Sequence, residues 1–184
     1  MANFNYLEEI PEFKNFASIC IEAEKRWRTD TPVSCVKEIR TVLEMAIRWV
    51  YHTDRRLISE NISQNNLYDL MSNKKFSCII GTKLTNELHY IRKKGNIATH
   101  ENGINIDKNV ANTCMKYLFN FIQWMEATYC KKHYKKRSFK ESGMTDTVLD
   151  NLTLKNIGLI AGGVLGGVAT IALKNLIFSP KDKA

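Results

Sequence analysis

Apolar residues recur every three or four positions along the first 130 residues, which is the spacing of amphipathic helices. This pattern predicts four long helices, over residues 11–28, 32–52, 82–99 and 107–129, and a short helical piece over residues 67–71. Thr31 followed by Pro32 marks the start of the second helix, because threonine caps a helix and proline suits its first position. Asp107 is the expected cap of the fourth. The sequence therefore predicts an all-α fold, a bundle of four main helices plus short pieces.

The segments between these helices are expected to be loops. Residues 59–66 are rich in serine and asparagine, and a second loop is predicted through Lys74 and Lys75 to Gly81. The Glu101-Asn-Gly run is expected to end the third long helix. We place the helical domain at residues 1–130, a basic segment and linker at 131–155, an apolar helix at 156–178 and a polar tail at 179–184.

The C-terminal apolar segment has the length of a membrane span. Residues 157–178 would extend about 33 Å as a helix, against about 30 Å of bilayer hydrocarbon. Its glycines fall at helical spacing, which favours close association of two membrane helices; they are Gly158, Gly162, Gly163, Gly166 and Gly167. We expect a single-pass transmembrane, self-associating helix, with a buried soluble hairpin as the alternative.

The charge of the chain favours anionic partners. Its 27 Lys and Arg against 19 Asp and Glu give a net charge of +8, which suits nucleic acid or an anionic membrane face. Five widely spaced cysteines without a C-x-x-C pair predict reduced thiols, mostly buried. No secretory signal is visible at the N-terminus. We therefore expect the N-terminal domain to lie in the cytoplasm, and no metal or cofactor is expected.

A cluster of cations precedes the apolar segment. It is expected to contact anionic lipid on the cytoplasmic side of the membrane, or alternatively RNA, with neighbouring aromatic rings stacking on bases. Its members are Lys131, Lys132, Lys135, Lys136 and Arg137.

The third long helix carries the sharpest candidate site. Arg92, Asn96 and His100 are spaced by four and share one helix face. A guanidinium can hold a phosphate and an imidazole can transfer protons near neutral pH, an inventory that suits metal-independent RNA cleavage. Lys93 and Lys94 add positive charge that could contact nucleic acid. The alternative is structural, with Asn96 and His100 bonding the helix end and Gly95 allowing two helices to approach.

Several motifs carry a family resemblance. They are Asn3-Phe4-x-x-Leu7, Ala23-Glu24, Arg40-x-x-x-Glu44 and Gly95-Asn96-x-Ala98-x-His100. Together they resemble a helical domain of unknown function found at the N-terminus of type I restriction enzyme R subunits, within the HEPN superfamily. The resemblance implies a HEPN-like bundle that dimerises. The ribonucleases of the superfamily carry an arginine followed after four to six residues by histidine, whereas seven residues separate Arg92 from His100 here.

Arg40 and Glu44 lie one helical turn apart, and we interpret them as a structural ion pair that locks the second long helix against the third.

Three functions follow from these observations. The first is a membrane-tethered, dimerising binding or adaptor module in prokaryotic defence against foreign nucleic acid, with a defence-system protein as partner. The second is a metal-independent endoribonuclease whose site is formed by Arg92, Asn96 and His100 from two subunits. The third is a membrane-permeabilising effector that assembles through its glycine-rich helix. We favour the first, because it explains the departure from the ribonuclease motif.

Overall fold

A computed structural model describes residues 2–29, 31–58, 65–100 and 106–141. The chain divides into two compact units, Met1–Gly143 and Met144–Ala184. All described residues belong to the first unit, so the expected membrane helix with Gly158, Gly162, Gly163, Gly166 and Gly167 lies outside them, as does the expected stop at residues 101–103.

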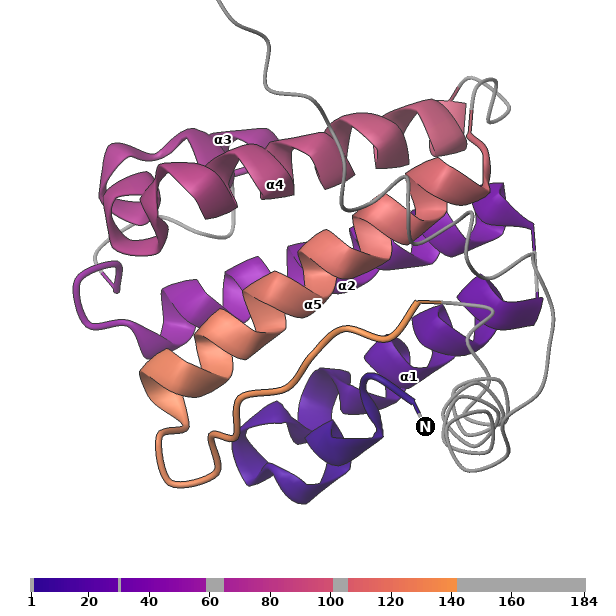
Figure 1. Cartoon of the computed structure of the whole chain (residues 1–184). Coiled ribbons are helices and arrows are strands. Elements are labelled where there is room, and N and C mark those ends of the chain that lie inside the picture. The colour runs from indigo at the N-terminus through magenta and orange to yellow at the C-terminus, as the bar shows by residue number, and fades with distance from the viewer. Residues whose placement is uncertain (1, 30, 59–64, 101–105, 142–184) are drawn as a thin grey trace, which may run out of the picture. The chain divides into compact units, whose positions relative to one another are not determined.

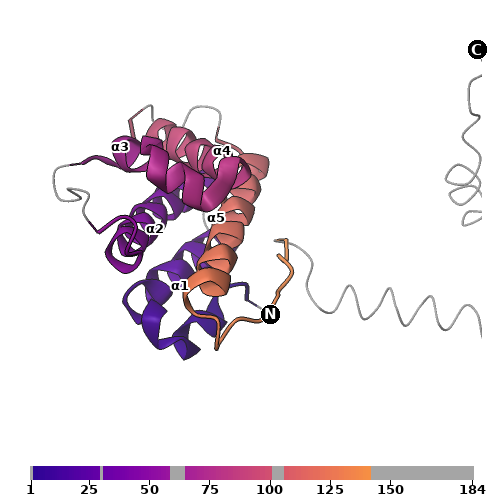
Figure 2. The same ribbon diagram turned by 90° about the vertical axis from the view of Figure 1, so that its left-hand side faces the viewer.

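The described residues form helices and no strand, which confirms the all-α prediction. Two short 3₁₀ helices and five α-helices follow one another (Figures 1 and 2): η1 (Asn5–Glu9), η2 (Pro11–Phe13), α1 (Lys14–Thr29), α2 (Pro32–Thr53), α3 (Leu67–Ser72), α4 (Lys74–His100) and α5 (Lys108–Tyr129). None of the described helices is both long and apolar enough to cross a membrane.

Both predicted helix caps are present. The Thr31 hydroxyl accepts a hydrogen bond from the Ser34 backbone N–H at 3.3 Å, and Asp107 Oδ1 accepts one from the Val110 N–H at 2.8 Å. Each side chain satisfies a backbone donor that the first turn of a helix leaves without a partner. The predicted starts of α2 and α5 are therefore confirmed.

The predicted loop through Lys74 and Lys75 is wrong. The Asn73 side chain accepts hydrogen bonds from the N–H groups of Lys75 and Phe76, at 2.8 and 3.3 Å, so it caps a helix that begins at Lys74. Gly81 then interrupts α4 with φ 80° and ψ 160°, a conformation that favours glycine. The predicted third long helix corresponds to the part of α4 that follows Gly81.

Helix α2 is the centre of the bundle and packs against α1, α4 and α5. Its inward face is fully buried and consists of Cys35, Val36, Ile39, Val42, Leu43, Ala46, Ile47, Val50 and Tyr51. Short α3 packs mainly on α4, and the two run side by side in Figure 1. The thiols are free; Cys20, Cys35, Cys114 and Cys130 are buried, while Cys78 is exposed.

The segment after α5 does not leave the bundle. The His133 N–H donates to the Cys130 carbonyl at 2.9 Å, and the chain then runs back between α5 and α1 (Figure 1). We call residues 131–140 the strap. Its Phe139 ring packs on Trp27 of α1 and Phe119 of α5, with ring centroids 5.5 and 5.6 Å apart. The first unit therefore continues past the boundary expected at residue 130, because the strap packs on the bundle and the unit runs to Gly143.

Candidate functional site

The predicted face of α4 is present, but its three residues are not brought together. His100 lies eight positions after Arg92 in continuous helix, which corresponds to about 12 Å along the axis. His100 is exposed at the C-terminal end of α4. The Arg92 guanidinium instead lies against the Tyr68 ring of α3, so within one chain the structure does not place it beside the His100 imidazole.

Asn96 takes part in a contact between helices. Arg40 Nε of α2 donates a hydrogen bond to Asn96 Oδ1 at 2.9 Å. The Arg40 side chain reaches Asn96 by crossing Gly95, where an added Cβ would lie 2.5 Å from Arg40 Cδ and 2.6 Å from Arg40 Cβ. Gly95 is thus the position that lets α2 and α4 approach, and the Asn96 amide oxygen is already occupied.

The expected ion pair between Arg40 and Glu44 has a long distance between its charged atoms. Arg40 Nη1 lies 3.9 Å from Glu44 Oε2, whereas Arg48 Nη2 lies 2.9 Å from Glu44 Oε1. Arg48 also donates to the Asn65 carbonyl at 3.3 Å, ahead of α3. The link between α2 and α4 therefore depends on the Arg40 bond to Asn96 more than on the pair with Glu44.

Arg92 lies in a different setting. Its guanidinium carbon is 4.9 Å from the centre of the Tyr68 ring of α3, while its Nε is buried without a hydrogen-bond partner. Tyr68 is 52% exposed, and its ring centre lies 6.1 Å from that of the half-buried His89. We call Tyr68, His89 and Arg92 the α3–α4 platform.

The sequence did not predict two members of this platform. His89 could have been found, because it precedes Arg92 by three residues and such positions share a helix face. Tyr68 could not, because only the packing of α3 on α4 places it there. Burial, followed by the positive charges of Arg92 and Lys93, lowers the pKa of His89 below its ordinary value of 6.5. The imidazole is therefore neutral at pH 7 and can both donate and accept a hydrogen bond.

Lys93 and Lys94 lie in different surroundings. Lys93 is exposed and close enough to His89 to lower its pKa. The Lys94 ammonium lies 5.7 Å from the centre of the Tyr90 ring, which in turn packs edge-on against Tyr117 of α5. Lys93 thus extends the positive charge of the platform, whereas Lys94 covers an aromatic contact between α4 and α5.

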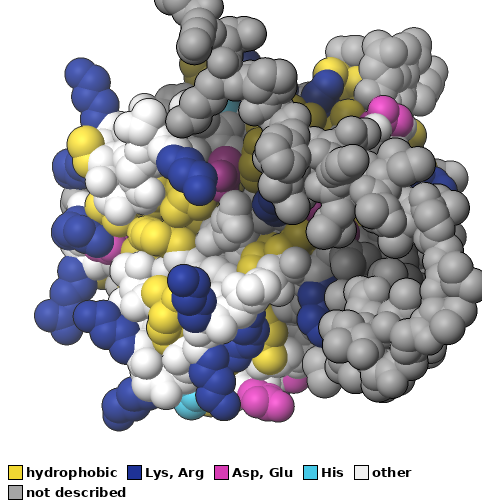
Figure 3. Space-filling view, viewed as in Figure 1, with side chains coloured by type: hydrophobic (Ala, Val, Ile, Leu, Met, Phe, Trp, Pro, Cys, Tyr) yellow, Lys and Arg dark blue, Asp and Glu magenta, His cyan; other side chains and the backbone are white. Residues whose placement is uncertain are grey.

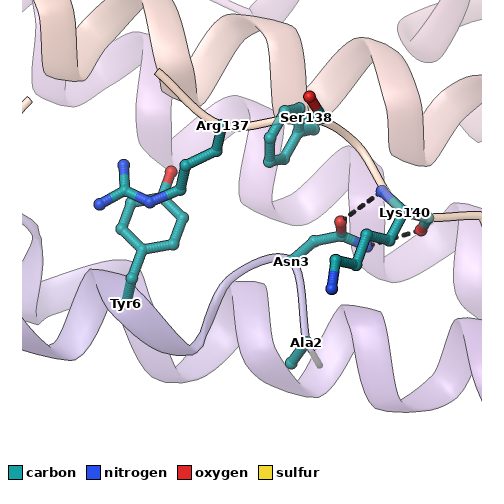
Figure 4. A pocket seen from close by; sticks show the side chains of 7 residues that line it. Ala2, Asn3, Tyr6, Arg137, Ser138 and Lys140 are labelled. Carbon is teal, nitrogen blue, oxygen red and sulfur yellow. Dashed lines mark hydrogen bonds between the residues drawn. The ribbon is translucent and has the colours of Figure 1, made fainter. Parts of the chain in front are cut away.

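The cations of the strap also differ in their surroundings. Arg137 Nη1 donates to both oxygens of Glu126, at 2.9 and 2.7 Å, and its guanidinium lies 3.5 Å from the Tyr6 ring centre. Figure 4 shows Arg137 beside Tyr6, and the strap bonded to Asn3 through Lys140. Glu126 is fully buried. The sequence predicts that Arg137 contacts lipid or nucleic acid, whereas in the structure its guanidinium is bonded to Glu126 and packs on Tyr6.

The remaining cations of the cluster are exposed. They form no ion pair within the described part of the chain, and they are Lys131, Lys132, Lys135 and Lys136. Figure 3 shows Lys and Arg side chains spread over the described part of one face, with hydrophobic side chains between them. The residues that the structure describes contain no group of three His, Cys, Asp or Glu that could hold a metal ion.

Comparison with domain families assigns most of the bundle to one family. Residues 22–147 match the domain of unknown function DUF4145. The chain belongs to the DUF4145 family. The matched region begins within α1 and includes α2, α3, α4, α5 and the strap, so both the Arg40 contact with Asn96 and the α3–α4 platform lie inside the DUF4145 domain. Comparisons with curated proteins and with solved structures find no match.

Proposed function

We propose that the chain is a membrane-tethered, dimerising HEPN-like module that binds single-stranded RNA without cleaving it and acts as an adaptor in prokaryotic defence. One observation supports binding over cleavage. The Asn96 amide oxygen is bonded to Arg40, and His100 lies about 12 Å along the helix from Arg92. Within one chain the acid–base and phosphate-holding groups are therefore apart, and the Asn96 amide oxygen that a site built from two subunits would also use is already bonded, which favours holding RNA over cutting it.

The α3–α4 platform is the proposed RNA contact. An exposed aromatic ring can stack on an unpaired base, a contact worth about 1–3 kcal/mol per base. Arg92 covers one part of the Tyr68 ring, and its guanidinium with the Lys93 ammonium can contact the phosphates on either side of the stacked base. This arrangement favours single strands with little sequence preference.

The membrane tether and the dimer are proposed on the evidence of the sequence. The apolar length of residues 157–178 and their glycine spacing favour a membrane helix. The HEPN resemblance supports dimerisation, a defence role and a defence-system protein partner.

The experiment measures binding and cleavage together. The full chain in neutral detergent micelles is titrated into fluorescently labelled single-stranded RNA with EDTA, and the same samples are run on a denaturing gel. We expect binding without cleavage, and at least about a fivefold weaker affinity for Tyr68→Ala, since one stacked base is lost. Ile58→Ala is the control, because Ile58 is 58% exposed and lies outside both the platform and the basic cluster.

Two results would contradict this proposal in different ways. RNA fragments with 2′,3′-cyclic phosphate ends that disappear in His100→Ala would identify an endoribonuclease. Dye leakage from liposomes that persists in His100→Ala but stops in Gly162→Leu would identify a membrane-permeabilising effector. Flotation of the full chain with phosphatidylcholine vesicles tests the tether separately.

A further inference from the structure

Residues of η1 and the strap line a small open hollow. It has a volume of about 210 Å³, and Lys132, His133 and Lys135 of the strap line it together with Tyr6 and Glu9 of η1. A water molecule occupies about 30 Å³ of liquid, so the hollow has room for roughly seven waters or one hydrated anion. It is smaller than the pockets of about 300–1,000 Å³ that hold whole drug-sized molecules.

The lining of this hollow is positively charged. Arg137 forms one wall, but its charge is balanced by the buried carboxylate of Glu126. Glu9 then faces two lysines, Lys132 and Lys135, neither of which forms an ion pair with another described residue. The hollow therefore has an excess of positive charge together with N–H donors, which suits an anion.

Hydrogen bonds hold the backbone of the strap in place around Lys135. The Lys135 N–H donates to Glu126 Oε1 at 3.3 Å, and the Lys135 carbonyl accepts from Arg137 Nη1 at 2.9 Å. The Arg137 N–H donates to Gln123 Oε1 at 3.0 Å. Because the backbone is bonded at Lys135 and Arg137, the Lys135 side chain extends from a fixed position, which lowers the entropic cost of binding a ligand.

We propose that this hollow, between η1 and the strap, binds a phosphate group. Its size fits one phosphate, carried either by a lipid headgroup or by a small soluble compound, and does not fit several nucleotides of RNA. The phosphate oxygens accept from the Lys132 and Lys135 ammonium groups, with His133 as a further donor. The lipid source rests on the proposed membrane tether; the phosphate site does not.

The experiment follows the melting temperature of the full chain in neutral detergent micelles while inorganic phosphate replaces chloride at constant ionic strength. We expect a saturable rise in Tm for the wild type, since a ligand that binds only the folded state stabilises it. The rise should be absent in Lys132→Ala/Lys135→Ala. Both side chains are exposed and the strap bonds use backbone atoms of Lys135, so the variant should retain the wild-type Tm without phosphate.

The matched control is Lys108→Ala/Lys116→Ala, which removes the same charge from exposed positions on α5 and should keep the phosphate response. Vesicles of phosphatidylcholine with and without phosphatidic acid distinguish the two sources. A lipid source predicts that the strap variant loses the preference for phosphatidic acid; a soluble source predicts that the preference is unchanged while the response to inorganic phosphate is lost.

Three outcomes would overturn the site: no rise in the wild type, an unchanged rise in the strap variant, or an equal loss in the α5 control. Weaker RNA binding by the strap variant with an intact phosphate response would assign these lysines to nucleic acid instead. A wild type that responds to phosphate but does not float with phosphatidylcholine would contradict the tether and leave the phosphate site standing.

Discussion

The strap and the α3–α4 platform both place an arginine against a tyrosine, yet they differ in what lies behind the arginine. Arg137 is 3.5 Å from the Tyr6 ring centre and bonds both oxygens of the fully buried Glu126. Arg92 is 4.9 Å from the Tyr68 ring centre, and its buried Nε has no hydrogen-bond partner. The first arginine is thus bound to a buried carboxylate, whereas the second forms no ion pair with another described residue and lies beside a Tyr68 ring that is 52% exposed.

Buried carboxylates account for this difference. Glu126 accepts bonds from Gln123, Lys135 and Arg137, and so attaches the strap to α5. Glu24 of α1 accepts from the backbone N–H groups of Asn3 and Phe4 in the same way. A carboxylate buried without such partners would destabilise the fold, so each one fixes the segment that supplies its donors.

The largest effect is expected for Arg137→Ala. It leaves the Glu126 carboxylate buried without its cation, and removing one partner of a buried pair typically costs about 3–5 kcal/mol. Arg92→Ala removes an arginine that has no buried carboxylate as partner, and should cost only the contact with the Tyr68 ring, about 0.5–1 kcal/mol. Urea denaturation of both variants measures the free energy of unfolding directly.

Lys136→Ala is the control for this pair, since it removes a neighbouring exposed cation from the strap. Equal losses in Arg137→Ala and Arg92→Ala would contradict the comparison, and would show that Arg92 also supports the fold.

A smaller effect is expected for Gly95→Ala. The new methyl group would meet Arg40 at 2.5 Å from its Cδ and 2.6 Å from its Cβ. A change of rotamer can move Cδ, but Cβ moves only if α2 moves away from α4. We expect a net destabilisation of about 1–2 kcal/mol, because the steric cost exceeds the roughly 1 kcal/mol by which alanine favours a helix over glycine.

Asn96→Ala separates the two parts of this contact. It removes the acceptor for Arg40 but introduces no new methyl group at Gly95, so it should cost about 1 kcal/mol. Unchanged stability of Gly95→Ala would show that the approach of α2 to α4 does not depend on a glycine at that position.

The elements that the sequence predicted well are set by local chemistry. The starts of α2 and α5 follow from Thr31 and Asp107, whose caps involve residues three positions away. The start of α4 at Lys74 depends on a cap of the same kind from Asn73, and was missed because serine, asparagine and lysine nearby indicated a loop. A cap is recognised in the sequence only when the apolar repeat after it is long enough.

The strap was missed for a different reason. Its contacts join Lys140 to Asn3 and Phe139 to Trp27, residues more than one hundred positions apart, and no local pattern encodes them. One signal was present, because Glu126 falls on the apolar stripe of α5 that includes Ile122. A carboxylate on a core stripe indicates a distant cation. For the candidate site, helical spacing placed Arg92 and Asn96 on one face, whereas only the fold shows which of them is already bonded.

The smallest effect concerns His89 of the α3–α4 platform. Because burial, Arg92 and Lys93 lower its pKa below 6.5, the folded state holds the proton less tightly than the unfolded state does. The resulting stabilisation is complete above the unfolded pKa and is lost as the pH falls through the folded pKa. Between about pH 7 and pH 5, His89→Gln should therefore lose less stability than the wild type.

Urea denaturation at each pH gives the slope of the free energy of unfolding against pH for both proteins. His100→Gln is the control, because it shows what another histidine of α4 contributes to this slope. Equal slopes for His89→Gln and the wild type would mean that neither burial nor the neighbouring cations lower the pKa of the imidazole.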